Sequence, residues 1–169
     1  MSNLNKIAAS FRDPSGFMFR RDGILYRQVH KHYQRQYDQL AGSGLLESLW
    51  KQGLLIRSNE VDVQPAEKET VYRVIQPEEL PYISYPYEWS FSQYKDAALA
   101  TLQIHKQAFE KGFILKDASA YNIQFVNDKA VLIDTLSFDI YEPGEPWVAY
   151  RQFCQHFLAP LALMALTDI

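Results

Sequence analysis

Three oxygen-bearing side chains in the second half of the chain have the types and the spacing of a site for a hard cation. Asp117 precedes Asn122 by five residues in a short polar segment, and Asp134 follows the next pair of apolar runs. Carboxylate and amide oxygens are typical ligands of Mg²⁺. The pattern therefore predicts one pocket that contains a carboxylate, an amide and a second carboxylate.

A hairpin is expected to bring Asn122 and Asp134 together. The apolar runs Ile123–Val126 and Ala130–Ile133 flank the polar residues Asn127–Lys129. If these three polar residues form the loop, Asn122 lies opposite Asp134 at the open end of the hairpin. Opposite Cβ atoms are about 4.5–5.5 Å apart, which is close enough to share one Mg²⁺ ion. A two-residue turn would shift the register and remove this opposition.

Taken singly, each of these residues also has an ordinary structural explanation. Asp117 fits the cap of a turn at residues 118–120, Asn122 fits an Asx turn, and Asp134 fits the cap of a strand end. The combination of all three with the expected register is what favours a functional pocket.

Local signals predict the elements of the first half. Asp22-Gly23 lies between apolar runs and predicts a hairpin over residues 17–29. Residues 45–52 predict a short helix that is closed by Gly53. Residues 71–75 predict a strand.

A linker and a long helix follow. Residues 77–89 contain three Pro and three Tyr and predict an extended linker, so we divide the chain into regions 1–89 and 90–169. Ser90 and Gln93 fit a capping box at the start of a helix that ends before Gly112. The residues expected along its buried stripe are Tyr94, Ala98, Leu102, His105 and Phe109.

The composition is that of a folded chain. Among 169 residues, 47% are hydrophobic and 14% aromatic, which argues against a disordered chain. A net charge of −3 removes the electrostatic argument for a nucleic-acid or anionic-membrane partner. The single cysteine, Cys154, excludes an intramolecular disulfide framework and a cysteine-rich zinc site. The mixture of strands and helices predicts an α+β fold.

Neither end of the chain fits the pattern of a targeting or membrane segment. Residues 1–10 lack the long apolar region of a signal peptide. The longest apolar run, Phe157–Leu166, contains Pro160 and is shorter than the roughly 20 residues of a membrane span. We expect a cytoplasmic protein without a membrane partner. Because exposed apolar surface needs a cover, the run predicts either truncation at the C-terminus or a helix docked on the core.

The Asp-x4-Asn segment, the hairpin and the following Asp resemble the catalytic core of protein-kinase-like phosphotransferases, including the aminoglycoside phosphotransferase type. The matching residues are Asp117, Asn122 and Asp134. The resemblance implies a two-lobed fold with a small β-rich N-terminal lobe and a helical C-terminal lobe. It also implies that Asp117 accepts or orients the proton of an acceptor hydroxyl. Asn122 and Asp134 would hold Mg²⁺ on the phosphates of ATP.

The same resemblance assigns nucleotide contacts outside this core. Backbone groups near Tyr85 to Glu88 would meet the adenine. Gly16 is the one residue that stands for the family's Gly-rich phosphate loop, because the first half has no GxGxxG motif. Arg27, with Lys31 as a second candidate, would replace the family's strand lysine, and Glu47 would be its acidic partner.

A second resemblance concerns the whole chain. The segments are 11–16, 83–93, 115–122 and 147–157. They resemble the N-terminal region of bacterial proteins labelled class I SAM-dependent methyltransferases, some of them called nodulation-protein-like. None of the seven Gly residues forms a strand–GxGxxG–helix cofactor loop. This resemblance therefore implies a downstream methyltransferase domain as a partner, and no methyl transfer by these residues.

Two functions follow from these observations. The first is a Mg²⁺-dependent phosphotransferase that uses ATP to phosphorylate a hydroxyl on a small molecule, a sugar or a protein. The second is a non-catalytic, kinase-like N-terminal module of a larger methyltransferase protein, used for substrate or partner recognition. The retained trio Asp117, Asn122 and Asp134 favours the first function. The missing Gly-rich loop and strand lysine favour the second.

Overall fold

In the computed structural model, which describes residues 4–7, 10 and 13–167, the turn Asp22-Gly23 joins the two strands that the sequence predicts around it. Strands β2 (Gly16–Arg21) and β3 (Ile24–His30) pair in antiparallel fashion. Both turn residues have positive φ angles, 51° for Asp22 and 85° for Gly23. Such two-residue turns match the right-handed twist of paired strands. The first predicted hairpin is confirmed.

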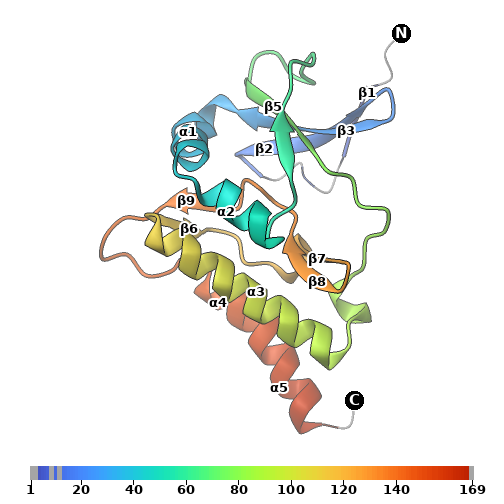
Figure 1. Cartoon of the computed structure of the whole chain (residues 1–169), viewed down its shortest axis with the longest axis vertical. Helices are drawn as coiled ribbons and strands as arrows, with labels where there is room; N and C mark the ends of the chain where they lie inside the picture. Colours follow the sequence, from blue (N-terminus) through green and yellow to red (C-terminus); the bar gives the residue numbers. More distant parts are fainter. Residues whose placement is uncertain (1–3, 8–9, 11–12, 168–169) are drawn as a thin grey trace. The chain divides into compact units, whose positions relative to one another are not determined.

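This hairpin belongs to a five-stranded antiparallel sheet with the strand order β1-β2-β3-β5-β4 (Figure 1). The remaining strands are β1 (Leu4–Lys6), β4 (Ser58–Glu60) and β5 (Val71–Pro77). After β3 the chain passes through the 3₁₀ turn η2 (Lys31–Tyr33) into helix α1 (Gln34–Gly42). The buried apolar cluster of the sheet is formed by Phe17, Phe19, Tyr26 and Val74.

The chain forms two units. The first unit consists of residues 1–39 and 57–79 and contains the five-stranded sheet. The second unit consists of residues 40–56 and 80–169. This division assigns α2 and residues 80–89 of the linker to the second unit, whereas the boundary expected from the sequence follows Trp89.

Capping residues set the ends of the two main helices of the second unit. Helix α2 (Leu45–Gln52) ends at Gly53, which has a φ of 69°. Helix α3 (Phe91–Glu110) starts after Ser90. The Gln93 N–H donates to Ser90 Oγ at 3.4 Å, and the Ser90 N–H donates to Gln93 Oε1 at 2.9 Å. This reciprocal pair is the predicted capping box, and both predicted helices are confirmed.

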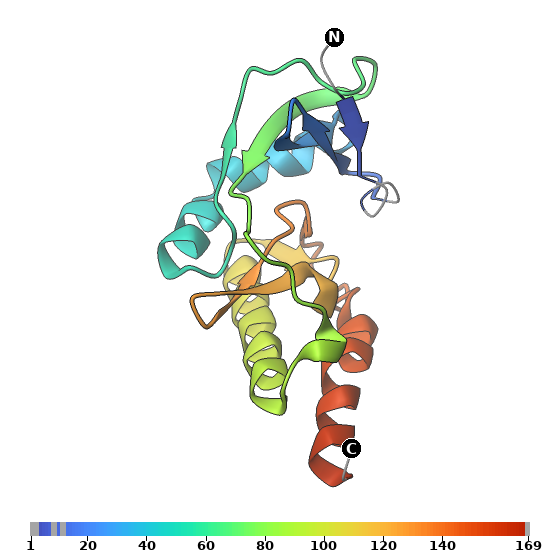
Figure 2. The ribbon, with the colours of Figure 1, turned by 90° about the vertical axis from the view of Figure 1, so that its right-hand side faces the viewer.

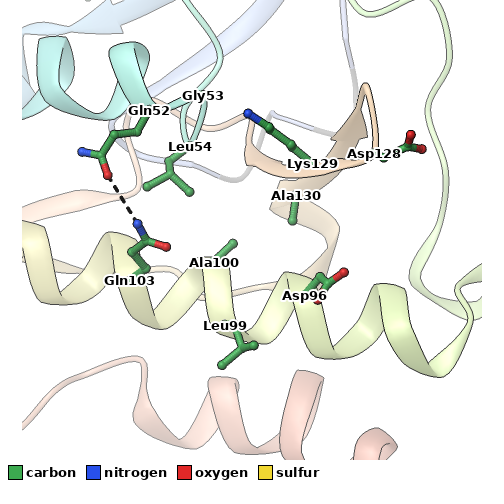
Figure 3. A pocket seen from close by; sticks show the side chains of 10 residues that line it. All are labelled: Gln52, Gly53, Leu54, Asp96, Leu99, Ala100, Gln103, Asp128, Lys129 and Ala130. Carbon is green, nitrogen blue, oxygen red and sulfur yellow. Dashed lines mark hydrogen bonds between the residues drawn. The ribbon is translucent and has the colours of Figure 1, made fainter.

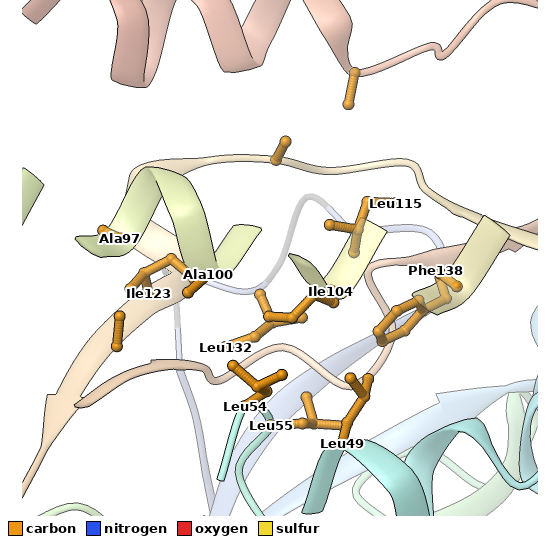
Figure 4. Packing of buried hydrophobic residues seen from close by; sticks show 14 of the residues in the cluster. Leu49, Leu54, Leu55, Ala97, Ala100, Ile104, Leu115, Ile123, Leu132 and Phe138 are labelled. Carbon is orange, nitrogen blue, oxygen red and sulfur yellow. The ribbon is translucent and has the colours of Figure 1, made fainter. Parts of the chain in front are cut away.

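The buried face of α3 differs from the predicted stripe. Leu102 and Phe109 are 41% and 51% exposed. Its buried residues are mostly small, and they are Ala97, Ala98, Ala100, Thr101, Ile104 and Ala108. Small side chains let neighbouring elements pack close to the helix. The core that they line also contains Leu49, Leu54, Leu55, Leu115, Ile123, Leu132 and Phe138 (Figure 4).

Two short antiparallel strand pairs and a helical C-terminal segment complete the second unit. The pairs are β6 (Phe113–Leu115) with β9 (Phe138–Ile140), and β7 (Ile123–Val126) with β8 (Lys129–Leu132). The C-terminal elements are α4 (Tyr150–Phe153), the π-helical turn η5 (Cys154–Leu158) and α5 (Ala159–Leu166). Helix α3 runs beside η5 and α5 (Figure 1). Among the described helices, none has the length and apolar character that crossing a membrane requires.

The linker before α3 is held by Gln124 of β7. Its buried side-chain amide donates to the Ser84 carbonyl at 2.9 Å and accepts the Ser84 N–H at 2.8 Å. Trp89 Nε1 donates to Ser84 Oγ at 2.9 Å, and the Trp89 ring meets the Phe125 ring edge-on. Figure 2 shows the green linker passing the β7–β8 hairpin and ending in the short turn η3 (Pro86–Glu88). The linker is thus fixed to the hairpin ahead of α3.

Candidate functional site

The polar loop that carries Asp117 starts at a strand end that two aromatic side chains hold. Leu115, the last residue of β6, donates its N–H to His105 Nδ1 at 3.4 Å. Its carbonyl accepts a hydrogen bond from Trp147 Nε1 at 2.6 Å. The rings of His105 and Trp147 stack with centroids 4.0 Å apart. Burial lowers the pKa of His105, which favours the neutral ring that an acceptor nitrogen requires.

Asp117 lies two residues after this strand end and is half-buried. Its Oδ1 accepts the backbone N–H of Ser119 at 3.0 Å and the side-chain Nε2–H of Gln152 at 2.8 Å. The bond from Ser119 is the turn cap that the sequence predicts. Among the described residues, none donates a hydrogen bond to Oδ2, so this oxygen has capacity left for a substrate proton.

Asn122 ends the loop, and its position relative to Asp134 differs from the prediction. The β7–β8 hairpin has a two-residue turn, Asn127-Asp128, with φ angles of 48° and 62°. Asn and Asp adopt positive φ more readily than other side chains, and such turns match the twist of paired strands. The Ile133 N–H therefore donates to the Asn122 carbonyl at 2.8 Å. The predicted direct opposition of Asn122 and Asp134 is wrong by one residue.

Ser137, which the sequence analysis did not single out, connects the three candidate segments. It is fully buried, and its carbonyl accepts the Lys116 N–H at 2.8 Å. Its own N–H donates to the Asp134 carbonyl at 3.3 Å. Its Oγ lies 3.5 Å from Asn122 Nδ2, the long limit of a hydrogen bond. The backbone beside Asp117, the side chain of Asn122 and the turn after Asp134 thus meet at one residue.

Two further side chains come from the C-terminal helical segment and were also missed. Gln152 in α4 contacts the Asp117 carboxylate through Nε2, and its Oε1 accepts the Ala118 N–H at 2.7 Å. His156 in η5 accepts the Ala120 N–H at Nδ1, at 3.3 Å. The loop is therefore held by two side chains that lie four residues apart.

The donor types at this site fit Mg²⁺. The Asn122 amino group faces Ser137 Oγ, so its Oδ1 is the amide atom of the ligand type. Asp134 supplies the carboxylate, and its Oδ1 accepts the Leu136 N–H at 2.9 Å, as the cap of a strand end does. Within the described part of the chain, no group of three or more His, Cys, Asp or Glu side chains is placed to hold a metal ion. A cation here would take its remaining ligands from phosphate oxygens and water, as Mg²⁺ does in nucleotide sites.

Arg27, the predicted replacement for the strand lysine, pairs with a carboxylate of its own unit. It is buried in β3, and its Nη2 lies 2.5 Å from Asp13 Oδ2. The other oxygen of Asp13 accepts the Ser15 N–H at 2.9 Å. Gly16 follows as the first residue of β2 and is buried. The Arg27 guanidinium thus holds the loop that leads into Gly16.

The other predicted nucleotide contacts lie on the surface. Glu47 is exposed in the first turn of α2. Glu88 is exposed and accepts the Tyr85 N–H at 2.7 Å, which closes the turn η3. Lys31, the second lysine candidate, belongs to the first unit and donates to the Glu69 carbonyl at 2.9 Å. Their roles in nucleotide binding stay predictions.

A separate open pocket of about 460 Å³ lies between the end of α2, helix α3 and the turn of the β7–β8 hairpin (Figure 3). At one side of it, Gln103 Nε2 donates to Gln52 Oε1 at 3.3 Å. Asp117, Asn122 and Asp134 do not line it. The three candidate site residues therefore lie outside this pocket.

The sequence of the chain is similar to that of a curated protein. No protein-family model matches the chain. It is similar to nodulation protein NoeA of Rhizobium meliloti (strain 1021), with 36% identity over 168 residues. The similarity covers 97% of this chain and 34% of NoeA, so the chain spans about a third of the length of its relative. This agrees with the predicted resemblance to nodulation-protein-like chains.

The fold is similar to the solved structure of vaccinia related kinase 3. The TM-score is 0.51 at 15% identity, over 88% of this chain and 52% of the kinase chain. At this identity the similarity concerns the fold and not the activity. The chain thus combines helices and an antiparallel sheet in a fold that is loosely kinase-like, and along nearly its whole length it is similar to one third of a nodulation protein.

Proposed function

We propose that the chain is a Mg²⁺-dependent, two-lobed, kinase-like module that transfers a phosphoryl group from a nucleoside triphosphate to a hydroxyl acceptor. The observation that supports it best is the meeting of the Asp117, Asn122 and Asp134 segments at buried Ser137. The order strand, Asp loop, hairpin and second Asp is that of kinase catalytic cores. The similarity of the fold to a kinase supports the same proposal.

Each residue of the trio has a role that its surroundings support. Asp117 would accept or orient the proton of the acceptor hydroxyl at Oδ2, while Oδ1 is held by its two donors. Asn122 and Asp134 would hold Mg²⁺, which neutralises charge on the phosphates. The acceptor oxygen forms the new bond to phosphorus as the bond to the nucleoside diphosphate breaks, and the hydroxyl proton passes to Asp117.

The nucleotide contacts are proposed separately for each unit. In the first unit, Arg27 and the loop that ends at Gly16 would contact phosphate, with Asp13 as the acidic partner that this unit supplies to Arg27. In the second unit, backbone groups near Glu88 would contact the adenine, and Glu47 stays a candidate for a cation partner. With a nucleoside triphosphate as donor, we place the reaction in the cytoplasm.

Nucleotide binding by the wild-type chain and an Asp134→Asn variant tests the proposal. A ligand at about 100 times its Kd stabilises the folded state by about 2.7 kcal/mol. For a chain of this size, that raises the melting temperature by roughly 5–10 °C. We expect this shift with ATP, ADP or GTP only when Mg²⁺ is present, and we expect most of it to be lost in Asp134→Asn.

Asp128→Asn is the matched control. Asp128 is exposed in the turn of the same hairpin, and asparagine tolerates its φ of 62°. This variant should keep the full shift. The absence of a shift with every nucleotide, or an equal shift in Asp134→Asn and the wild type, would overturn the proposal.

A second function is a non-catalytic module of a larger methyltransferase protein that recognises a substrate or a partner. It is favoured by the match to one third of NoeA and by the lack of a Gly-rich loop. In this case Asp134→Asn should leave partner binding unchanged. A pull-down between this chain and the rest of the full-length protein measures that binding.

A further inference from the structure

The C-terminal helical segment Tyr150–Leu158 is anchored in the core on one side and contacts the Asp117-bearing loop on the other. Phe153 and Phe157 are buried, with ring centroids 5.2 Å apart. The residues that precede them, Gln152 and His156, contact the loop. The segment includes the π-helical turn η5, and such turns are frequent at functional sites. An anchored backbone thus presents two polar side chains to the loop.

The amide of Gln152 matches its two partners in one orientation only. Its Nε2 donates to Asp117 Oδ1 at 2.8 Å, and its Oε1 accepts the Ala118 N–H at 2.7 Å. A 180° rotation of the amide would place two donors against each other at Ala118 and two acceptors against each other at Asp117. The side chain therefore fixes both the carboxylate and the peptide that follows it.

His156 holds the next peptide of the loop. Its Nδ1 accepts the Ala120 N–H at 3.3 Å and lies 3.3 Å from Ser119 Oγ. Because a backbone N–H can only donate, Nδ1 is the acceptor in this contact. Together with the bond from Ala118 to Gln152, this contact fixes the loop backbone directly after the carboxylate.

We propose that Gln152 is a positioning residue for phosphoryl transfer, which holds Oδ1 of Asp117 so that Oδ2 meets the acceptor hydroxyl. This inference rests on the proposed function. The other donor to Oδ1 is the Ser119 N–H, which belongs to the same loop and moves with it. Gln152 is thus the contact that ties the carboxylate to the core of the unit. A displacement of about 1 Å at a reacting group lowers a rate by roughly 100-fold.

The test compares three variants of the whole chain in Mg²⁺-ATP hydrolysis, with water as the acceptor, and in ATP binding. Gln152→Met removes both hydrogen bonds. Gln152→Glu keeps an oxygen for the Ala118 N–H and places a second oxygen against Oδ1 of Asp117. Gln155→Met makes the same change at an exposed position of the same segment. We expect both Gln152 variants to lower kcat about 100-fold with KM and Kd for ATP within about twofold, and Gln155→Met to match the wild type.

The glutamate variant separates positioning from a purely structural role. A residue that only supported the loop backbone would keep its function as glutamate, because the bond from Ala118 is retained. Wild-type kcat in Gln152→Glu would therefore overturn the positioning role and leave the proposed function intact. If the wild type binds ATP but does not hydrolyse it, the positioning role is overturned. If the wild type neither binds nor hydrolyses ATP, the proposed function is overturned as well. If Gln152→Met fails to fold, the isosteric Gln152→Glu variant still distinguishes a positioning role from a purely structural role.

Discussion

Replacing Gln124 with methionine tests how the linker before α3 is held. The Gln124 side chain is 2% exposed and forms two hydrogen bonds with the backbone of Ser84, at 2.8 and 2.9 Å. Methionine is unbranched and of similar size, so it fills the same space without forming either bond. The linker also contains the groups near Glu88 that we propose for adenine, so nucleotide affinity should fall together with stability.

The expected magnitude follows from these two bonds. Each contributes about 0.5–1.5 kcal/mol net, and the N–H and carbonyl of half-buried Ser84 would lose a partner that water replaces only in part. We expect the free energy of unfolding of the second unit to fall by about 2–3 kcal/mol. At 1.4 kcal/mol for each factor of ten, the linker should open roughly 30 to 140 times more often.

Hydrogen exchange at the Ser84 amide measures the local opening, and urea unfolding measures the loss of stability. Gln76→Met is the control, because Gln76 is an exposed glutamine on strand β5 of the first unit. This control should change stability by no more than about 0.5 kcal/mol. Wild-type exchange at Ser84 in Gln124→Met would show that the two bonds do not hold the linker, and would refute the reasoning.

Two further predictions concern His105 and Gly112. Burial lowers the pKa of His105 below its ordinary 6.5, so near that pH the unfolded chain binds a proton that the folded chain does not. The contribution of His105 to the free energy of unfolding is therefore complete above pH 6.5 and is lost as the pH falls toward the folded-state pKa. Urea unfolding between about pH 7.5 and 5 should show a steeper loss of stability in the wild type than in His105→Gln, and parallel curves would contradict this assignment. Gly112→Ala should lower the free energy of unfolding by about 1–2 kcal/mol, since a φ of 81° strains alanine although the space around the new Cβ is open. Gly42→Ala, with open space and an ordinary φ, is its control in the same thermal unfolding assay, and an equal loss in both variants would exclude backbone strain as the cause.

The elements that the sequence predicts correctly are those that a few neighbouring residues determine. Asp22-Gly23 needs only its own two backbone conformations to form a hairpin turn, and Ser90 with Gln93 forms a capping box within four residues. The second hairpin lacks such a unique local signal. Asn127, Asp128 and Lys129 fit a loop of two or three residues, and the pairing of the whole strands decides between them. The observed two-residue turn places Asn122 opposite Ile133, one residue before Asp134.

The buried face of α3 could not be predicted from its own pattern. The predicted stripe contains the bulkier residues Leu102 and Phe109, whereas the helix buries small residues around Ile104. Which face of a helix is buried depends on how close its neighbours come, and that distance is a property of the folded unit. Alanine has a small side chain and adds little to the hydrophobic contrast between the faces of a helix, so the sequence pattern favours the stripe of larger residues.

The three candidate site residues were identified by their spacing, but their partners were not. Ser137 lies 15 residues from Asn122, and Gln152 lies 35 residues from Asp117. Neither belongs to a motif, and serine and glutamine are ordinary surface residues in a sequence. Their contacts arise because β9 pairs with β6 and because α4 packs in the core of the second unit. The contacts that hold the Asp117 loop thus depend on tertiary structure, which the local sequence does not determine.

The contact between Gln152 and Asp117 bears on the choice between the two proposed functions. A non-catalytic module requires a folded loop, and the Ser119 N–H already caps the Asp117 carboxylate for that purpose. The bond from Ala118 to Gln152 and the bond from Ala120 to His156 already hold the loop backbone. A further donor on Oδ1 orients one carboxylate, which matters to a chain that uses that carboxylate in a reaction. We therefore favour the phosphotransferase over the recognition module. Asp134→Asn separates the two functions, because it should remove the Mg²⁺-dependent nucleotide shift in the first case and leave partner binding unchanged in the second.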